Sequence, residues 1–301
     1  MSGTIQGSMD TTPDPSSTEQ PDPQVHQELE PALPVEPIPS GIPTPVAPPE
    51  SIAPAWHTLV LAAGILALSF GGSTHLTSQR HSTNRLFTYG ATAAMELLML
   101  GWVALGLWLR KVPFRSLFGT VTRGFRGFAM DVGVALVFWF GSMMILGSIG
   151  LVWTAVEFAA AHKHLPTQPG QKIEPSESQK KTLRTLEQLA PENGSEIAAW
   201  VLLCCLAGLI EEAVFRGYLQ RQFTAWGKGN VALGVVFSAL MFGAAHGYQG
   251  VRNMVMLAVF GVLFSLLAIF RRSLRAGIFA HAGHDLFVGL LLALFRARHL
   301  L

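Results

Sequence analysis

Long apolar stretches dominate the chain, and they constrain its fold more than any other feature. A helix needs about 20 apolar residues to cross the hydrocarbon core of a bilayer. Seven stretches approach or exceed that length, at residues 56–72, 89–109, 130–156, 197–215, 230–247, 252–270 and 276–295. Only 13% of the residues are charged, against about 25% in a typical soluble domain. The pattern predicts an all-α polytopic membrane protein, a bundle of about seven transmembrane helices.

The first 50 residues have the opposite composition. They hold 12 of the 18 prolines and eight acidic residues, with neither Lys nor Arg. A segment with so few large apolar side chains cannot bury enough surface to offset its chain entropy. We therefore expect residues 1–54 to form a disordered, acidic, Pro-rich tail. It does not resemble a secretory signal, which would need a basic start and an early apolar core.

The remaining chain divides at a polar segment. Residues 55–158 hold the first three expected helices, residues 159–196 form a polar loop, and residues 197–292 hold the last four helices. Within the loop, "SESQKKTLRTLEQL" at 176–189 has the charge pattern of a helix that can lie on the membrane surface.

The loops that follow the second, fourth and sixth spans are rich in Lys and Arg. Seven spans place all three loops on one side of the membrane, and short basic loops face the cytoplasm. The expected location is the plasma (inner) membrane, with the N-terminus cytoplasmic and the C-terminus on the other side.

Ionisable side chains inside a span are candidate functional residues, because charges are costly in lipid. Glu96 is internal to the second span, and it can line a pathway or form a structural hydrogen bond to a neighbouring helix. Asp131 and Glu157 stand near the ends of the third span, where we expect an interfacial position without a role.

Two adjacent glutamates occur in the fourth span, in "EEAVFR" from Glu211 to Arg216. Glu212 and Arg216 have the spacing and order that favour an ion pair on a helix. Glu211 is rotated by about 100° from Glu212. We therefore expect Glu212 to pair with Arg216 and Glu211 to face a cavity as a free carboxylate. The alternative is that both glutamates are helix-end charges at the membrane interface.

Histidines follow in the later spans. If the fourth helix turns near Gly227, Glu211 and His246 both lie about 24 to 29 Å from that turn, at similar depth. His281 and Asp285 are four residues apart on the last helix, where a carboxylate can orient an imidazole or both groups can meet one metal or substrate atom. His281 is only about 12 Å past its own loop, so straight helices would leave it shallower than His246.

Together these pieces resemble the CPBP family of intramembrane proteases, which includes type II CAAX prenyl endopeptidases and bacteriocin-processing and immunity proteins. The family motif EExxxR corresponds to "EEAVFR". The motifs FxxxH and Hxxx(N/D) correspond to "FGAAH", from Phe242 to His246, and "HAGHD", from His281 to Asp285. The motifs occur in order on successive predicted spans, and the resemblance covers about residues 197–292.

The resemblance implies an endopeptidase that hydrolyses a peptide bond. In this family pattern Glu211, beside His246, activates water, and His281 and Asp285 stand at the substrate carbonyl and supply the oxyanion site. The residues expected to support the site are Glu212, Arg216 and Phe242.

A zinc-dependent mechanism is the alternative within the same family, with Glu211, His246 and His281 or Asp285 as ligands. Because the chain has no compact motif such as HExxH, we favour a mechanism without a metal cofactor.

The expected partners are the lipid bilayer and a peptide or membrane-protein substrate, and no nucleic acid. A non-catalytic immunity or scaffold protein of the same fold remains an alternative. A transporter that relays protons through Glu96 and Glu211 is a further alternative, although no internal repeat supports it.

The topology generates the first testable prediction. Reporter fusions at residue 120 and after residue 301 should report opposite sides of the membrane, because five of the seven expected spans, an odd number, lie between the two fusion points. The same side for both fusions would contradict the seven-span topology.

Overall fold

The computed structural model describes residues 50–76, 84–120, 124–161 and 189–298. The chain divides into two units, Met1–Val46 and Ala47–Leu301, and all described residues belong to the second unit. Most of the expected tail and nearly all of the expected surface helix at 176–189 lie outside the described residues.

The described residues form seven helices. In chain order they are α1 (Ala55–Leu76), α2 (Arg85–Leu109), α3 (Gly124–Ala161), one continuous helix made of α5 (Gly194–Glu211), η3 (Glu212–Leu219) and α6 (Gln220–Trp226), then α7 (Val231–Ala245), α8 (Val251–Arg271) and α9 (Arg275–Ala297). Two short 3-10 helices, η1 (Phe114–Phe118) and η4 (Gly247–Gln249), lie in loops. Within the described residues the all-α class is confirmed.

Five of these helices are long and apolar enough to cross a membrane, judged by length and composition. They are α2, α3, the continuous helix Gly194–Trp226, α8 and α9, and the apolar segments Ala55–Gly71 and Val231–Ala245 are shorter. The chain is therefore an integral membrane protein, and the seven expected spans correspond to these seven helices.

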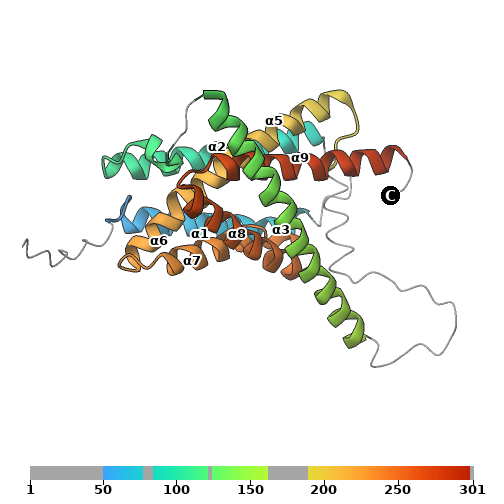
Figure 1. Ribbon diagram of the computed structural model, residues 1–301. Helices are drawn as coiled ribbons and strands as arrows, with labels where there is room; N and C mark the ends of the chain where they lie inside the picture. The colour runs from blue at the N-terminus through green and yellow to red at the C-terminus, as the bar shows by residue number, and fades with distance from the viewer. Residues whose placement is uncertain (1–49, 77–83, 121–123, 162–188, 299–301) are drawn as a thin grey trace, which may run out of the picture. The chain divides into compact units, whose positions relative to one another are not determined.

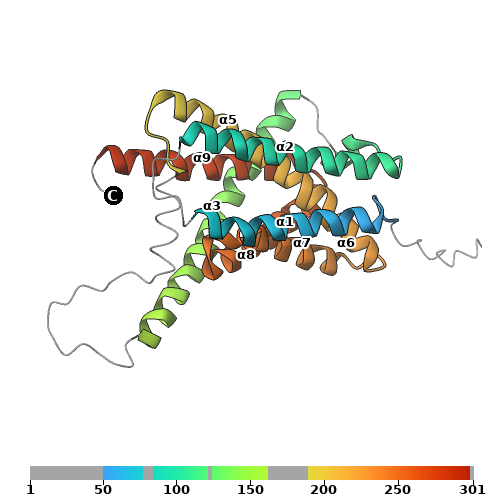
Figure 2. The ribbon, with the colours of Figure 1, turned by 180° about the vertical axis from the view of Figure 1, so that it is seen from behind.

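The helices of this unit form two layers (Figures 1 and 2). One layer contains α2, α5 and α9, and the other contains α1, α7 and α8. The continuous helix begins in the first layer and its α6 end packs on α7 in the second, while α3 runs obliquely and contacts both α8 and α9. The segment with the adjacent glutamates therefore passes between the two layers.

The middle of the continuous helix is a π-helix, Glu212–Leu219. A π-helix has hydrogen bonds between residues i and i+5 and occurs frequently at functional sites. The backbone N–H of Gln220 donates to the Phe215 carbonyl. The same carbonyl accepts a second hydrogen bond from Ser238 Oγ at 2.6 Å. The neighbouring helix α7 thus supports the π-helix where its backbone departs from the α-helical pattern.

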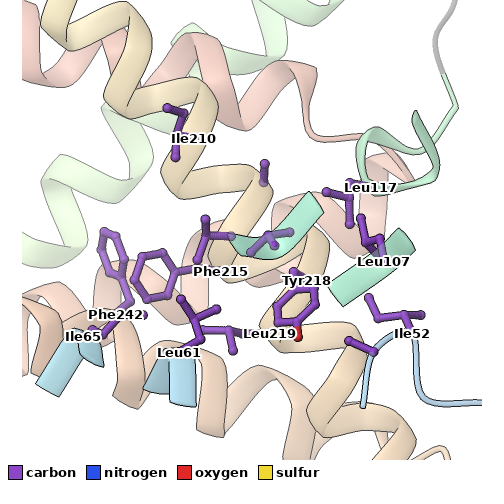
Figure 3. Close-up of a cluster of buried hydrophobic side chains, with 14 residues drawn as sticks. Ile52, Leu61, Ile65, Leu107, Leu117, Ile210, Phe215, Tyr218, Leu219 and Phe242 are labelled. Carbon is purple, nitrogen blue, oxygen red and sulfur yellow. The ribbon is translucent and has the colours of Figure 1, made fainter. Parts of the chain in front are cut away.

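The apolar side of the π-helix forms the centre of the core (Figure 3). Phe215, Tyr218 and Leu219 are almost completely buried there, and they belong to one cluster with Leu61 of α1 and Phe242 of α7. This burial holds the π-helix in a single orientation, so the polar side chains next to it are also fixed.

The basic loops gather at one end of the unit. Arg221 donates to the Ser116 carbonyl at 3.0 Å, which joins the α6 end to the loop after α2. Asp131 is buried and pairs with Arg271 at 2.9 Å and Arg275 at 3.2 Å, which joins α3 to the loop between α8 and α9. Asp131 is thus buried in an ion-pair cluster with two arginines at the end of α3 that faces the basic loops.

Glu157 lies near the other end of α3. Its Oε1 accepts from Trp153 Nε1 at 2.9 Å, and its Oε2 lies 3.7 Å from Arg252 of α8. Its side chain is 31% exposed, so Glu157 joins two helices while remaining accessible.

A close approach between α5 and α9 brings the motif residues together. Gly208 lies on α5 where a Cβ atom would be only 2.8 Å from the Ala282 backbone nitrogen of α9. Small residues allow membrane helices to pack backbone to backbone. Glu211 and Glu212 follow Gly208 by about one helical turn, so this contact sets their distance from α9.

We predict that Gly208→Ala lowers the free energy of unfolding by about 1–3 kcal/mol, because the new methyl group meets backbone and not a flexible side chain. Thermal unfolding in detergent measures the change. Gly283→Ala is the matched control, because a Cβ at Gly283 meets nothing within 4 Å. Equal stability of the two variants would contradict the close packing of α5 on α9.

Candidate active site

Glu212 is the most deeply buried carboxylate of the motifs, with 1% of its side chain exposed. Its Oε1 accepts from Arg216 Nη1 at 3.0 Å and lies 3.1 Å from His281 Nδ1. A carboxylate only accepts hydrogen bonds, so Nδ1 of His281 donates. The expected pair between Glu212 and Arg216 is present, and His281 is a further partner that the sequence pattern did not reveal.

The Arg216 guanidinium is enclosed by aromatic rings. It lies 4.3 Å from the ring centre of Phe242 and 5.0 Å from that of Phe264. Its Nη2 donates to the Gly261 carbonyl of α8 at 3.4 Å. Cations are attracted to ring faces, most strongly where water is excluded. Phe242, the first residue of the second motif, therefore packs against the arginine of the first motif.

His281 lies among three carboxylates. Besides Glu212 at its Nδ1, its Nε2 is 3.6 Å from Glu211 Oε2 and 3.7 Å from Asp285 Oδ2. The imidazole is 5% exposed, whereas the Asp285 side chain is 31% exposed. His281 thus joins the first and third motifs, and Asp285 lies on the more accessible side.

His281 lies level with the two glutamates, although straight helices with loops at equal depth would leave it shallower than His246. The start of α9 is level with Gly217 of the π-helix, not with Gly227, because a Cβ at Gly217 would be 3.3 Å from Leu274. From that level Glu211 is six residues back and His281 is seven residues on, about 9 and 10.5 Å at 1.5 Å per residue. The α6 segment simply extends past the start of α9.

Glu211 has a partly accessible carboxylate, with 13% of its side chain exposed. Its Oε2 lies 3.6 Å from His281 Nε2 but has no hydrogen-bond partner in the described structure. Glu96 of α2, 7% exposed, lies close enough to Glu211 for the two carboxyl groups to interact. Glu96 therefore joins the site as a second carboxyl group beside Glu211.

His246 ends α7 and opens the short loop that contains Tyr248. Its Nδ1 lies 2.9 Å from the Phe242 carbonyl, and its ring is 6.1 Å from the Tyr248 ring. Glu211 lies near His281 and Glu96, and its expected cooperation with His246 stays a prediction. Tyr248 lies in the loop between two spans, and burial raises the pKa of its phenol.

The zinc alternative uses Glu211, His246 and His281 or Asp285 as ligands. In the part of the chain that the structure describes, no group of three or more His, Cys, Asp or Glu side chains is arranged to hold a metal ion. His281 directs Nδ1 to Glu212, and His246 directs Nδ1 to a backbone carbonyl. Metal-bound histidines commonly use their second ring nitrogen in this way, so the mechanism without a metal stays a prediction.

Two site residues were not singled out from the sequence. Phe264 of α8 packs on Arg216 but looks like any other phenylalanine in an apolar stretch. Tyr248 had only its position two residues after His246 as a signal.

His284, within the third motif, accepts a hydrogen bond from Trp139 Nε1 at 3.2 Å and so contacts α3.

Comparison with known proteins agrees with the motifs. Residues 193–287 match the family described as type II CAAX prenyl endopeptidase Rce1-like. Neither the comparison with curated proteins nor that with solved structures gives a match. The resemblance is thus confirmed for the last four helices, and the chain is an integral membrane protein with a segment similar to CAAX-type proteases.

We predict that Glu212→Gln lowers the free energy of unfolding by about 3 kcal/mol, because it leaves a buried guanidinium without its carboxylate. Thermal unfolding measures the change. Glu157→Gln is the control, because that glutamate also faces an arginine but is 31% exposed. A Glu212→Gln protein as stable as wild type would show that the pair does not hold the fold.

Proposed function

We propose that the chain is an intramembrane endopeptidase that hydrolyses a peptide bond of a membrane-associated or peptide substrate. The observation that carries the proposal is the Glu211 carboxylate, whose Oε2 has no hydrogen-bond partner although water is largely excluded around it. An acceptor in that state is suited to bind and deprotonate a water molecule. The match to the CAAX prenyl endopeptidase family supports the same reaction class.

In the proposed reaction Glu211 takes a proton from water as the oxygen attacks the substrate carbonyl carbon. When the carbon–nitrogen bond breaks, Glu211 returns that proton to the leaving amine, so one water is consumed and two peptides form. His246 offers a ring nitrogen, Nε2, that can accept a hydrogen bond from the same water, since its Nδ1 is engaged. Asp285, the most exposed of the three carboxylates around His281, faces the incoming chain.

The supporting residues hold this geometry. Glu212 and Arg216 fix the π-helix and His281, and His281 fixes the orientation of Glu211 and Asp285. The reaction as proposed uses no bound metal, because each step is assigned to a side chain of this site. Metal analysis of the active purified protein tests this: stoichiometric zinc, lost together with activity in His246→Ala, would support the metal-dependent alternative.

The proposed orientation puts the basic loops in the cytoplasm. The contacts of Arg221 with Ser116 and of Asp131 with Arg271 bring these loops to one end of the unit, and short basic loops face the cytoplasm. The N-terminus would then also be cytoplasmic, in the plasma (inner) membrane. The proposed domain organisation is a tail at 1–54, three helices at 55–158, a loop at 159–196 and the protease core at 197–292.

We predict that Glu211→Gln abolishes cleavage while the protein stays folded, because an amide cannot take a proton from water. Purified wild type and variant are compared in detergent with a library of quenched-fluorescent peptides and with a prenylated CAAX peptide. Glu157→Gln should cleave like wild type. A wild type that cleaves none of these peptides would favour the non-catalytic immunity or scaffold alternative.

The same assay distinguishes the roles of the two adjacent glutamates. Activity of Glu212→Gln should fall together with the amount of folded protein, whereas Glu211→Gln should lose activity at full stability. A folded but inactive Glu212→Gln beside an active Glu211→Gln would reverse the two roles.

A further inference from the structure

The last turn of α7 brings His246 to the candidate active site. The ring of Phe242 has its centre 5.1 Å from that of the His246 ring and 5.9 Å from that of the His281 ring. His246 also interacts electrostatically with Asp285. The second motif therefore lies beside the third, and the position of His246 depends on how the end of α7 is held.

The His246 ring is fixed to its own backbone. Its Nδ1 donates to the Phe242 carbonyl at 2.9 Å, because a carbonyl only accepts. Its backbone N–H donates to the Gly243 carbonyl at 3.1 Å, and its carbonyl accepts from the Gln249 N–H at 2.9 Å. The ring therefore moves with this stretch of backbone, and so does its Nε2, the atom that the proposed reaction uses.

Ser69 of α1 holds that backbone on both sides of His246. Its hydroxyl donates to the Ala244 carbonyl at 2.6 Å and accepts from the Gly247 N–H at 2.8 Å. Helix ends leave backbone groups without partners in the helix, and a serine hydroxyl can donate and accept at once. Because Ser69 is only 4% exposed, water does not compete for these two bonds.

The packing of α1 against this loop is an independent observation. A Cβ atom at Gly247 would be 2.9 Å from Ser69 Oγ and 2.7 Å from the Phe70 ring. Contacts of that length would force the loop or α1 to shift. The absence of a side chain at Gly247, the residue directly after His246, therefore allows the loop to reach Ser69.

Ser69 is separate from the motifs. It lies on α1, whereas the match to the protease family begins at residue 193. In the sequence it is one serine in the apolar stretch 56–72, and nothing in its spacing relates it to His246. The motifs thus include the histidine but not the group that holds its backbone.

We propose that Ser69 is a positioning residue of the active site, whose hydroxyl holds the backbone around His246 so that Nε2 is placed for the attacking water. The inference rests on the proposed function. Ser69 does not touch the reacting atoms and acts only through His246, which makes α1 part of the catalytic unit.

The test compares Ser69→Ala with Ser142→Ala. Ser142 of α3 is 2% exposed and donates to the Trp139 carbonyl of its own helix, so this control deletes a buried hydrogen bond that joins no second helix. Ser69→Ala should lower kcat by roughly 10- to 100-fold, because misplacement by about 1 Å costs about 100-fold, with KM little changed.

Ser142→Ala should keep the wild-type kcat. Rates are expressed per amount of folded protein, and the substrate is the quenched-fluorescent peptide that the wild type cleaves best. A higher KM with unchanged kcat in Ser69→Ala would assign Ser69 to substrate binding and overturn the proposal.

Hydrogen exchange measures the contact without catalysis. The Gly247 N–H loses its acceptor in Ser69→Ala, so the peptide that covers residues 244–250 should exchange faster by mass spectrometry. The same peptide should exchange at the wild-type rate in Ser142→Ala. Unchanged exchange in Ser69→Ala would overturn the contact, and faster exchange with the wild-type kcat would overturn the positioning role.

Gly247→Ala disturbs the same contact from the other side and keeps the Ser69 hydroxyl. It should also lower kcat. The double variant Ser69→Ala, Gly247→Ala should lose less than the product of the two separate losses, because changes at one shared contact are not additive. Losses that multiply fully would show that the two residues act independently, and would overturn the proposal.

Glu211→Gln is measured in parallel so that the two hypotheses fail separately. If it is inactive while Ser69→Ala keeps the wild-type kcat, the role of Ser69 is overturned and the proposed function stands. If Glu211→Gln remains active while Ser69→Ala loses kcat, the assignment of the base fails and the positioning role is supported. A wild type that cleaves no peptide overturns both.

Discussion

The ion pair between Glu212 and Arg216 is the interaction on which the site depends. Both side chains are essentially inaccessible, and breaking a buried pair costs several kcal/mol because a charge is left alone in a medium of low polarity. Two further hydrogen bonds support the pair, since His281 donates to Glu212 and the Gly261 carbonyl accepts from Arg216, while Arg216 Nε has no hydrogen-bond partner among the described residues. It therefore ties the π-helix to α8 and α9 at the same point.

The segment similar to CAAX-type proteases does not form the site alone. Glu96 on α2 brings a carboxyl group to Glu211, and α2 precedes the matched segment. The first helix also contacts the π-helix, since Tyr218 binds His57 of α1. Gln222 of α6 binds the backbone of Ala53, just before α1. The N-terminal helices thus contribute to the site, α2 from the layer of α5 and α9 and α1 from the other layer.

The site contains many hydrogen-bond acceptors and few donors. Three carboxylates surround His281, and a fourth carboxyl group, that of Glu96, lies beside Glu211. Such a site can hold and deprotonate water, and each charge that it contains is costly in a membrane interior.

Composition and local spacing determined the fold class and the identity of the motifs. In apolar stretches long enough to span a membrane, the backbone groups must form hydrogen bonds within the segment. An all-α bundle was therefore predictable. The ion pair of Glu212 with Arg216 was also predictable, because residues four apart on a helix are neighbours.

Contacts between distant segments depended on the tertiary structure. The π-helix, the meeting of His281 with Glu212 and the burial of Asp131 under two arginines all follow from how the helices are offset along their axes. That offset is set by close contacts such as Gly208 against Ala282. A sequence pattern records the spacing along one helix, but it does not record the height at which two helices pass each other.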